Sequence, residues 1–124
     1  MSLKLLIVDD SKVCQLLIRG YVQECRPDWI CTTADNAEDA MRLIEQQQFD
    51  AFSLDYNLPG RNGLMLAKWI RSSNKRSFIG LLTSNILNHI EAQAESDQIS
   101  YYRKPPVQHV IQQFVCDAER YIQD

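Results

Sequence analysis

Several side chains in this sequence are suited to binding a cation and a phosphoryl group. Each stands at the end of an apolar or mixed run, and they are Asp9-Asp10, Asp55, Thr83-Ser84 and Lys104. Three carboxylates packed together repel one another and raise each other's pKa unless a cation lies among them. Mg²⁺ suits such a set, because it prefers oxygen ligands and is usually held by one or two carboxylates and several waters. A lysine ammonium and a threonine hydroxyl add donors that bind phosphoryl oxygens.

Each of these signals also has a simpler structural explanation when taken alone. Asp9-Asp10 can cap a helix, and Asp55 can be a surface carboxylate in a loop. Thr83 can be an ordinary strand-end residue, and Lys104-Pro105 an ordinary turn. Their joint occurrence, each at the end of a predicted strand, makes coincidence improbable and favours one shared site.

Five short runs predict β-strands, and a helical pattern follows each of them. The runs are 4–8, 29–34, 51–55, 78–82 and 99–103. Apolar residues then recur at helical spacing over 14–25, 37–44, 66–73, 86–94 and 107–122. Strict alternation of strand and helix predicts a parallel sheet with helices on both faces.

Local residues predict how some of these helices begin and end. Asp10 or Ser11 is expected to cap the first helix, which Pro27 stops. Asp35 with Glu38 resembles a capping box for the second helix. After Asp55, the turn dipeptides Pro59-Gly60 and Asn62-Gly63 prevent the strand from continuing.

The polarity of the runs predicts the order of the strands. Residues 4–8, 51–54 and 78–82 are almost wholly apolar, as strands covered on both faces must be. Residues 29–34 and 99–103 include polar side chains and suit the edges. The order 2-1-3-4-5 meets both conditions and defines a doubly wound, flavodoxin-like α/β fold. Ligands of such sheets bind beyond the carboxyl ends of the strands, where the acidic and basic residues converge.

Length and charge exclude several classes of partner. The 124 residues suffice for one domain, and the net charge of -3 argues against a nucleic-acid-binding surface. Arg71, Lys75 and Arg76 come nearest to a basic patch, which we interpret as a solvated helix end. Apolar runs are too short to span a membrane, and Met1–Asp10 lacks the pattern of a signal peptide. Neither nucleic acid nor membrane is expected as a direct partner.

The cysteines predict a reducing environment. Cys14, Cys25, Cys31 and Cys116 form no C-x-x-C pair and have no metal-ligand spacing with His89 or His109. Three of them fall at positions expected to be apolar. We expect reduced, buried thiols that act as small hydrophobic side chains, as in a cytoplasmic protein.

These motifs resemble the receiver domain of two-component response regulators, as in single-domain chemotaxis regulators. The resemblance covers residues 1–124. It rests on Val8-Asp9-Asp10-Ser11, Phe49-Asp50, Asp55-Tyr56-Asn57-Leu58-Pro59-Gly60, Gly63, Thr83-Ser84, and Tyr101 with Lys104-Pro105.

The resemblance implies a phosphorelay signal receiver that catalyses only its own phosphorylation and dephosphorylation. Asp55 would accept a phosphoryl group from a phosphohistidine on a histidine kinase or a phosphotransfer protein. Mg²⁺ would be held by Asp10, Asp55 and the backbone carbonyl of Asn57, with Asp9 helping through water.

The resemblance also implies a switch. Lys104 would pair with the phosphoryl oxygens, and Thr83 would move to bond them. The ring of Tyr101 would then swing inward and alter the surface built from the fourth helix, fifth strand and fifth helix. The Lys104-Pro105 peptide bond is expected to be cis, as in the family.

Two alternative functions deserve comparison. A pseudo-receiver would keep the fold and act as an interaction module without phosphate, although every functional position is filled here. A phosphatase of the haloacid dehalogenase type needs a second carboxylate two residues after the nucleophile, where this chain has Asn57. The chain also lacks room for the substrate cap of such an enzyme.

Departures from the family pattern concern rates and contacts rather than chemistry. The segment 96–100 lacks a glycine that is often found there, Tyr56 is bulky beside the acceptor, and Pro106 extends the turn. The output stays open, because the signal can pass to a downstream protein or to an attached output domain.

Overall fold

The computed structural model describes residues 2–74, 76–84 and 98–123. Its elements are β1 (Lys4–Val8), α1 (Lys12–Cys25), β2 (Ile30–Ala34), α2 (Ala37–Gln46), β3 (Ala51–Asp55), α3 (Gly63–Ser73), β4 (Phe78–Thr83), β5 (Ser100–Arg103) and α5 (Gln108–Gln123). They match the predicted elements to within a few residues. The helix predicted over 86–94 lies outside the described residues.

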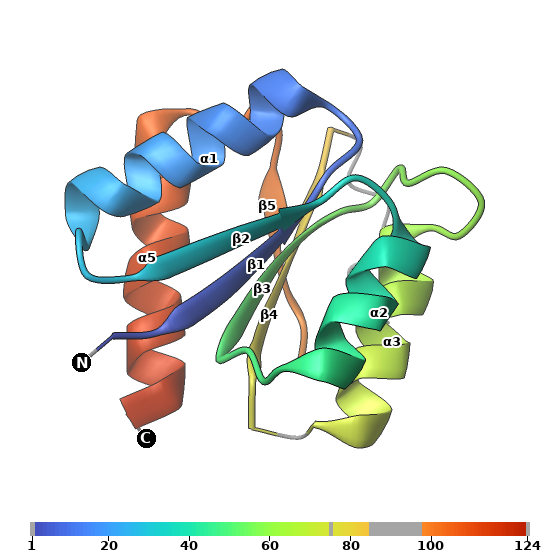
Figure 1. Ribbon diagram of the computed structural model, residues 1–124. Coiled ribbons are helices and arrows are strands. Elements are labelled where there is room, and N and C mark those ends of the chain that lie inside the picture. The colour runs from blue at the N-terminus through green and yellow to red at the C-terminus, as the bar shows by residue number, and fades with distance from the viewer. Residues whose placement is uncertain (1, 75, 85–97, 124) are drawn as a thin grey trace.

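All five strands form one parallel sheet in the order β2-β1-β3-β4-β5, as predicted (Figure 1). The three central strands are buried nearly throughout. The edge strand β2 exposes about half of Ile30. Polarity therefore identified the edges correctly, because only an edge strand tolerates polar or exposed side chains on both faces.

Two layers of helices cover the sheet, with α1 and α5 on one face and α2 and α3 on the other (Figure 1). Successive side chains of β1 alternate between the two resulting cores. Leu5 and Ile7 pack on the α1–α5 side, whereas Leu6 and Val8 pack on the α2–α3 side. Because both faces of β1 are buried, successive residues must all be apolar. This explains why its sequence is a nearly continuous apolar run and not a polar–apolar alternation.

The caps of the helices agree with the sequence in one case and differ in another. Ser11 caps α1, since its hydroxyl accepts a hydrogen bond from the Cys14 backbone N–H. The predicted capping box at Asp35 is wrong, because Asn36 caps α2 by accepting from the Asp39 N–H at 2.8 Å. The Asp35 carboxylate instead accepts hydrogen bonds from Lys12 and Gln15 of α1, which hold it away from the start of α2.

The four cysteines are free thiols, as expected, but they are not buried as expected. Cys14, Cys25 and Cys31 are half-buried, and Cys116 is exposed. Cys116 lies on the outer side of α5, between core positions that face the sheet.

The described helices include none with the length and apolar character needed to cross a membrane.

Gly80 on β4 lies directly against Phe114 of α5. A Cβ there would overlap the ring of Phe114, which is 1% exposed and already in edge contact with Phe78 and Tyr102. We expect Gly80→Ala to lower the free energy of unfolding by about 1–3 kcal/mol, the usual cost of overpacking a core.

The matched control is Gly20→Ala on α1, where a Cβ meets nothing within 4 Å. This change should raise the free energy of unfolding by about 0.5–1 kcal/mol, because alanine is the better helix former. Urea denaturation measures both. Equal stability of the two variants would contradict the close packing of β4 on α5.

Candidate functional site

Three carboxylates meet at the carboxyl edge of the sheet. Asp9 follows β1 and Asp55 ends β3, and these two strands are neighbours. Asp9 is 1% exposed and Asp55 is 5% exposed, whereas Asp10 is exposed. Carboxylate oxygens of the three residues lie within 4.8 Å of one another. The sequence-predicted cluster is thus assembled, with two members buried and one open to solvent.

Lys104 supplies a positive charge to this cluster from the end of β5. Its Nζ lies 3.0 Å from Asp9 Oδ2 and 3.2 Å from Asp55 Oδ1. The Lys104 backbone N–H donates to the Thr83 carbonyl at 2.9 Å, which fixes the lysine beside the end of β4. The Lys104–Pro105 peptide bond is cis, as the family resemblance implied.

Burial and charge together set the protonation of this pair. Burial raises the pKa of Asp55, and the nearby Asp9 charge raises it further, against the opposing effect of Lys104. Burial lowers the pKa of Lys104, but its hydrogen bond to Asp9 and the charges of both carboxylates outweigh burial and raise it. Lys104 therefore stays a cation at neutral pH. Ionisation of Asp55 is less favourable than that of a carboxyl group in water.

The turn after Asp55 folds back tightly against the sheet. The Tyr56 N–H donates to the Leu82 carbonyl, and the Gly63 N–H donates to the Tyr56 carbonyl, each at 2.8 Å. A Cβ on Gly63 would overlap the Asp55 carbonyl, and Gly60 has a φ of 79°. These contacts explain the two glycines of the motif, since only glycine fits both demands without strain.

The other predicted residues lie around the same edge. The Asn57 N–H donates to Asp55 Oδ1 at 3.3 Å, so this residue lies directly beside the acceptor carboxylate. Thr83, at the end of β4, is 2% exposed. Tyr101 on β5 is half-buried and packs against the core on the α2–α3 side.

Sequence reasoning missed Gln15, which supports the cluster, and assigned Asp35 a different role. Gln15 of α1 is 5% exposed and donates to the Asp9 carbonyl and to Asp35. The pKa of Asp35 is lowered, first by its hydrogen bond from Lys12 and then by that from Gln15. One available signal was that Gln15 shares a helix face with Ile18 and Val22, where a polar residue needs a buried partner.

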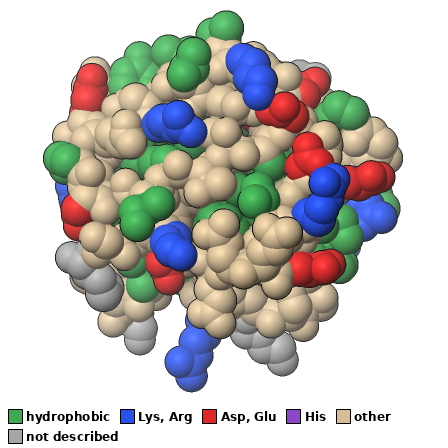
Figure 2. All heavy atoms as spheres, viewed as in Figure 1, with side chains coloured by type: hydrophobic (Ala, Val, Ile, Leu, Met, Phe, Trp, Pro, Cys, Tyr) green, Lys and Arg blue, Asp and Glu red, His purple; other side chains and the backbone are tan. Residues whose placement is uncertain are grey.

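The apolar face predicted for α1 is wrong at Leu17, which points to solvent, whereas Ile18 and Val22 are buried as predicted. Val13, Leu16 and Leu17 are 67%, 65% and 41% exposed, at the spacing of one helix face. Figure 2 shows hydrophobic side chains along the upper part of the molecule, where α1 lies in Figure 1. This apolar stripe begins immediately after the acidic cluster.

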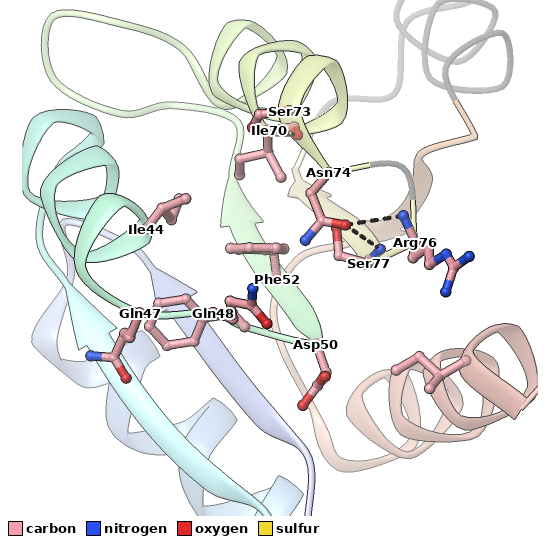
Figure 3. A pocket seen from close by; sticks show the side chains of 12 residues that line it. Ile44, Gln47, Gln48, Asp50, Phe52, Ile70, Ser73, Asn74, Arg76 and Ser77 are labelled. Atoms are coloured by element: carbon pink, nitrogen blue, oxygen red, sulfur yellow. Dashed lines mark hydrogen bonds between the residues drawn. The ribbon is translucent and has the colours of Figure 1, made fainter.

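A cavity of about 610 Å³ lies at the opposite, amino edge of the sheet (Figure 3). Ile44, Phe52 and Ile70 form its apolar wall, and the C-terminal ends of α2 and α3 border it. It is remote from the acidic cluster. Cavity volume therefore does not mark the chemistry of this molecule, because the carboxylates and the lysine suited to a cation and a phosphoryl group lie at the other edge of the sheet.

The fold and the acidic site define a class of protein, the receivers of two-component signalling. A sequence model of the response regulator receiver domain matches residues 5–115. The chain belongs to this family.

Solved receiver structures share the fold. The chemotaxis protein CheY4 of Vibrio cholerae superposes with a TM-score of 0.84 at 21% identity, over 95% of this chain and 99% of that one. A two-component response regulator from Clostridium difficile gives a TM-score of 0.85 at 25% identity, over 99% and 100% of the two chains.

Curated relatives match over part of their length. The transcriptional regulatory protein YpdB of Escherichia coli K12 is 28% identical over 103 residues, which are 83% of this chain and 42% of that protein. A protein-glutamate methylesterase/protein-glutamine glutaminase of Paramagnetospirillum magneticum is 39% identical over 63 residues, which are 51% of this chain and 18% of that protein. The chain therefore spans less than half of these relatives.

The raised pKa of Asp55 predicts a stabilising substitution. A carboxyl group whose pKa is higher in the folded state favours folding while it is protonated, and that contribution is lost as pH rises through the folded pKa. At pH 7 in a chelator, Asp55→Asn should therefore increase the free energy of unfolding. We expect about 0.5–2 kcal/mol, as for other stabilising changes at functional sites.

Urea denaturation between pH 4 and 8 tests this prediction. The gain should be largest at pH 7 and should shrink toward pH 4. Glu45→Gln removes an exposed carboxylate from α2 and is the charge-matched control, which should change stability by less than about 0.5 kcal/mol. A loss of stability in Asp55→Asn at pH 7 would contradict the assigned direction of the pKa.

Proposed function

We propose that this protein is a phosphorelay receiver whose Asp55 accepts a phosphoryl group from a phosphohistidine partner. The observation that carries the proposal is the Lys104 ammonium, which lies between the buried carboxylates of Asp9 and Asp55. Catalysis of phosphoryl transfer consists mainly of positioning and charge stabilisation, and this arrangement supplies both.

The donor set fits Mg²⁺. Asp9 and Asp55 are buried with Lys104 between them, and the exposed Asp10 adds a third carboxylate on the solvent side. Asp10, Asp55 and the backbone carbonyl of Asn57 would hold the ion, with Asp9 acting through water. When bound, the ion would neutralise negative charge on the phosphoryl oxygens.

The chain's own residues would carry the transfer. A carboxylate oxygen of Asp55 attacks the phosphorus, the O–P bond forms, and the P–N bond to the partner's histidine breaks, leaving its electron pair on the imidazole nitrogen. Lys104 already contacts Asp55 and needs little movement to pair with the transferred phosphoryl oxygens. The low exposure of Asp55 keeps bulk water from the reacting atoms.

Partner and output follow the same proposal. A histidine kinase or histidine phosphotransfer protein would supply the phosphoryl group, and the apolar stripe of Val13, Leu16 and Leu17 beside the crevice supports contact with a protein rather than a free metabolite. The signal would pass to a downstream protein or an attached output domain. Four free thiols agree with a cytoplasmic location.

Labelling by a small phosphodonor tests the function. Acetyl phosphate with Mg²⁺ should add one phosphoryl group at Asp55, detected by intact mass and by mapping after borohydride reduction. Asp55→Asn should stay unmodified.

The metal site has a separate test. Asp10→Asn should remain folded and lose the Mg²⁺-dependent rise in melting temperature, since a ligand that binds only the native state stabilises it.

A pseudo-receiver would show no labelling with or without Mg²⁺. Label on any residue other than Asp55 would contradict the assignment of the acceptor.

A switch through Thr83 and Tyr101 completes the proposal. Phosphorylation brings roughly -1.5 to -2 charges and three acceptor oxygens, so the modified state offers the Thr83 hydroxyl a phosphoryl oxygen to bond. Thr83 and Tyr101 lie on the neighbouring strands β4 and β5, where Leu81 is the register partner of Tyr101. Movement of Thr83 toward the acceptor would open space that the half-buried Tyr101 ring can fill.

Thr83→Ala should separate modification from response. The variant should still be labelled at Asp55, yet the amide shifts induced by beryllofluoride over residues 98–115 should be much smaller than in the wild type, because the differential contact is gone. NMR spectra with and without beryllofluoride provide the measurement. A full wild-type pattern of shifts in Thr83→Ala would mean that the switch runs through other residues.

A further inference from the structure

Gln15 is a buried polar side chain next to the acidic cluster. It lies in the first turns of α1, one helical turn after the cap Ser11, and is 5% exposed. Its Nε2 lies 2.6 Å from the Asp9 carbonyl oxygen, 2.8 Å from Asp35 Oδ1 and 3.3 Å from the Ala34 carbonyl oxygen. All three neighbours are acceptors, so only the NH₂ end of the amide can face them.

These contacts fix one particular peptide group. The Asp9 N–H is held by the Ala34 carbonyl at 3.1 Å, and its carboxylate is held by the Ser11 N–H and Lys104. The Asp9 carbonyl belongs to the peptide that leads into Asp10, and Gln15 is its side-chain donor. The orientation of that peptide decides where the Asp10 side chain projects.

Asp10 depends on this anchor. Its side chain is exposed, and within the described residues its carboxylate has neither a hydrogen bond nor an ion pair. Asp9 and Asp55, in contrast, are each held by Lys104. The one carboxylate that faces solvent is therefore placed through its backbone, and a buried glutamine sets that backbone.

We propose that Gln15 is a positioning residue of the acidic site: its amide fixes the Asp9–Asp10 peptide and thereby sets the affinity for a divalent cation. This inference rests on the proposed function. Gln15 touches neither the cation nor the phosphoryl group, and it acts only through the Asp9 carbonyl. The Asp35 carboxylate, paired with Lys12 at 2.7 Å, orients the amide from the other side.

Gln15→Met is the appropriate variant, because methionine keeps the length and the helix propensity of glutamine but has no donor. Loss of such an orienting contact typically weakens metal binding by about 10–100-fold. We expect the Mg²⁺ dissociation constant, measured by calorimetry, to rise by at least about tenfold. In the metal-free protein the Asp10 amide resonance should shift or broaden.

Val22→Ala controls for stability alone. Val22 lies on the same helix and is fully buried. Its aliphatic side chain has no hydrogen-bonding group that could hold the acidic cluster in place. The Val22→Ala variant should have a lower melting temperature. Its Mg²⁺ dissociation constant should stay within about twofold of the wild type, a much smaller change than the loss of an orienting contact causes.

In labelling by acetyl phosphate, Gln15→Met should need more Mg²⁺ for half-maximal rate but approach the wild-type rate at saturation.

The possible outcomes separate the two proposals. Wild-type Mg²⁺ affinity in Gln15→Met, or an equal loss in Val22→Ala, would overturn the role of Gln15 and leave the phosphoacceptor assignment intact. If the wild type binds no Mg²⁺ and accepts no phosphoryl group, the proposed function fails, and the role of Gln15 fails with it.

Discussion

The attraction between one ammonium and two buried carboxylates organises this molecule. Asp9 and Asp55 are almost fully removed from water, and such charges are tolerated only when they are paired. Lys104 meets both at about 3 Å, and it reaches them because β5 ends at the same edge of the sheet as β1 and β3. The parallel topology is thus the means by which residues far apart in sequence neutralise one another.

The same ion pairs leave the negative charge of the site only partly neutralised. One lysine charge faces two carboxylates, and Asp10 adds another negative charge on the solvent side. The cluster therefore keeps a surplus of negative charge that a divalent cation would offset. The mutual repulsion of these carboxylates lowers stability in favour of function, a trade-off that is common at functional sites.

Much of the fold could be predicted because its signals are local. The almost wholly apolar runs at 4–8, 51–54 and 78–82 require strands covered on both faces, and the structure has these strands at the centre of the sheet. The acidic cluster followed from the strand ends. The cap of α2 could not be predicted, because Asp35 and Asn36 are equally good caps and a contact with α1, 20 residues away, decides between them.

Gln15 escaped prediction for a similar reason. A glutamine in an amphipathic helix is ordinarily solvated, and only the path of β1 and β2 past α1 turns this one into a buried donor. The exposed Leu16 and Leu17 were equally out of reach, because helical periodicity gives the spacing of an apolar face but not whether a partner covers it. Sequence patterns specify elements well and the contacts between them less well.

The two ends of the described chain lie at the amino edge of the sheet, across the molecule from the acidic cluster (Figure 1). This follows from the topology, since β1 starts at that edge and α5 runs back toward it. A bead, surface or fluorescent carrier attached through either end would therefore leave the crevice facing outward. The arrangement makes the protein well suited to immobilised assays, in which the tether neither shields the acceptor nor lies in the path of an approaching donor.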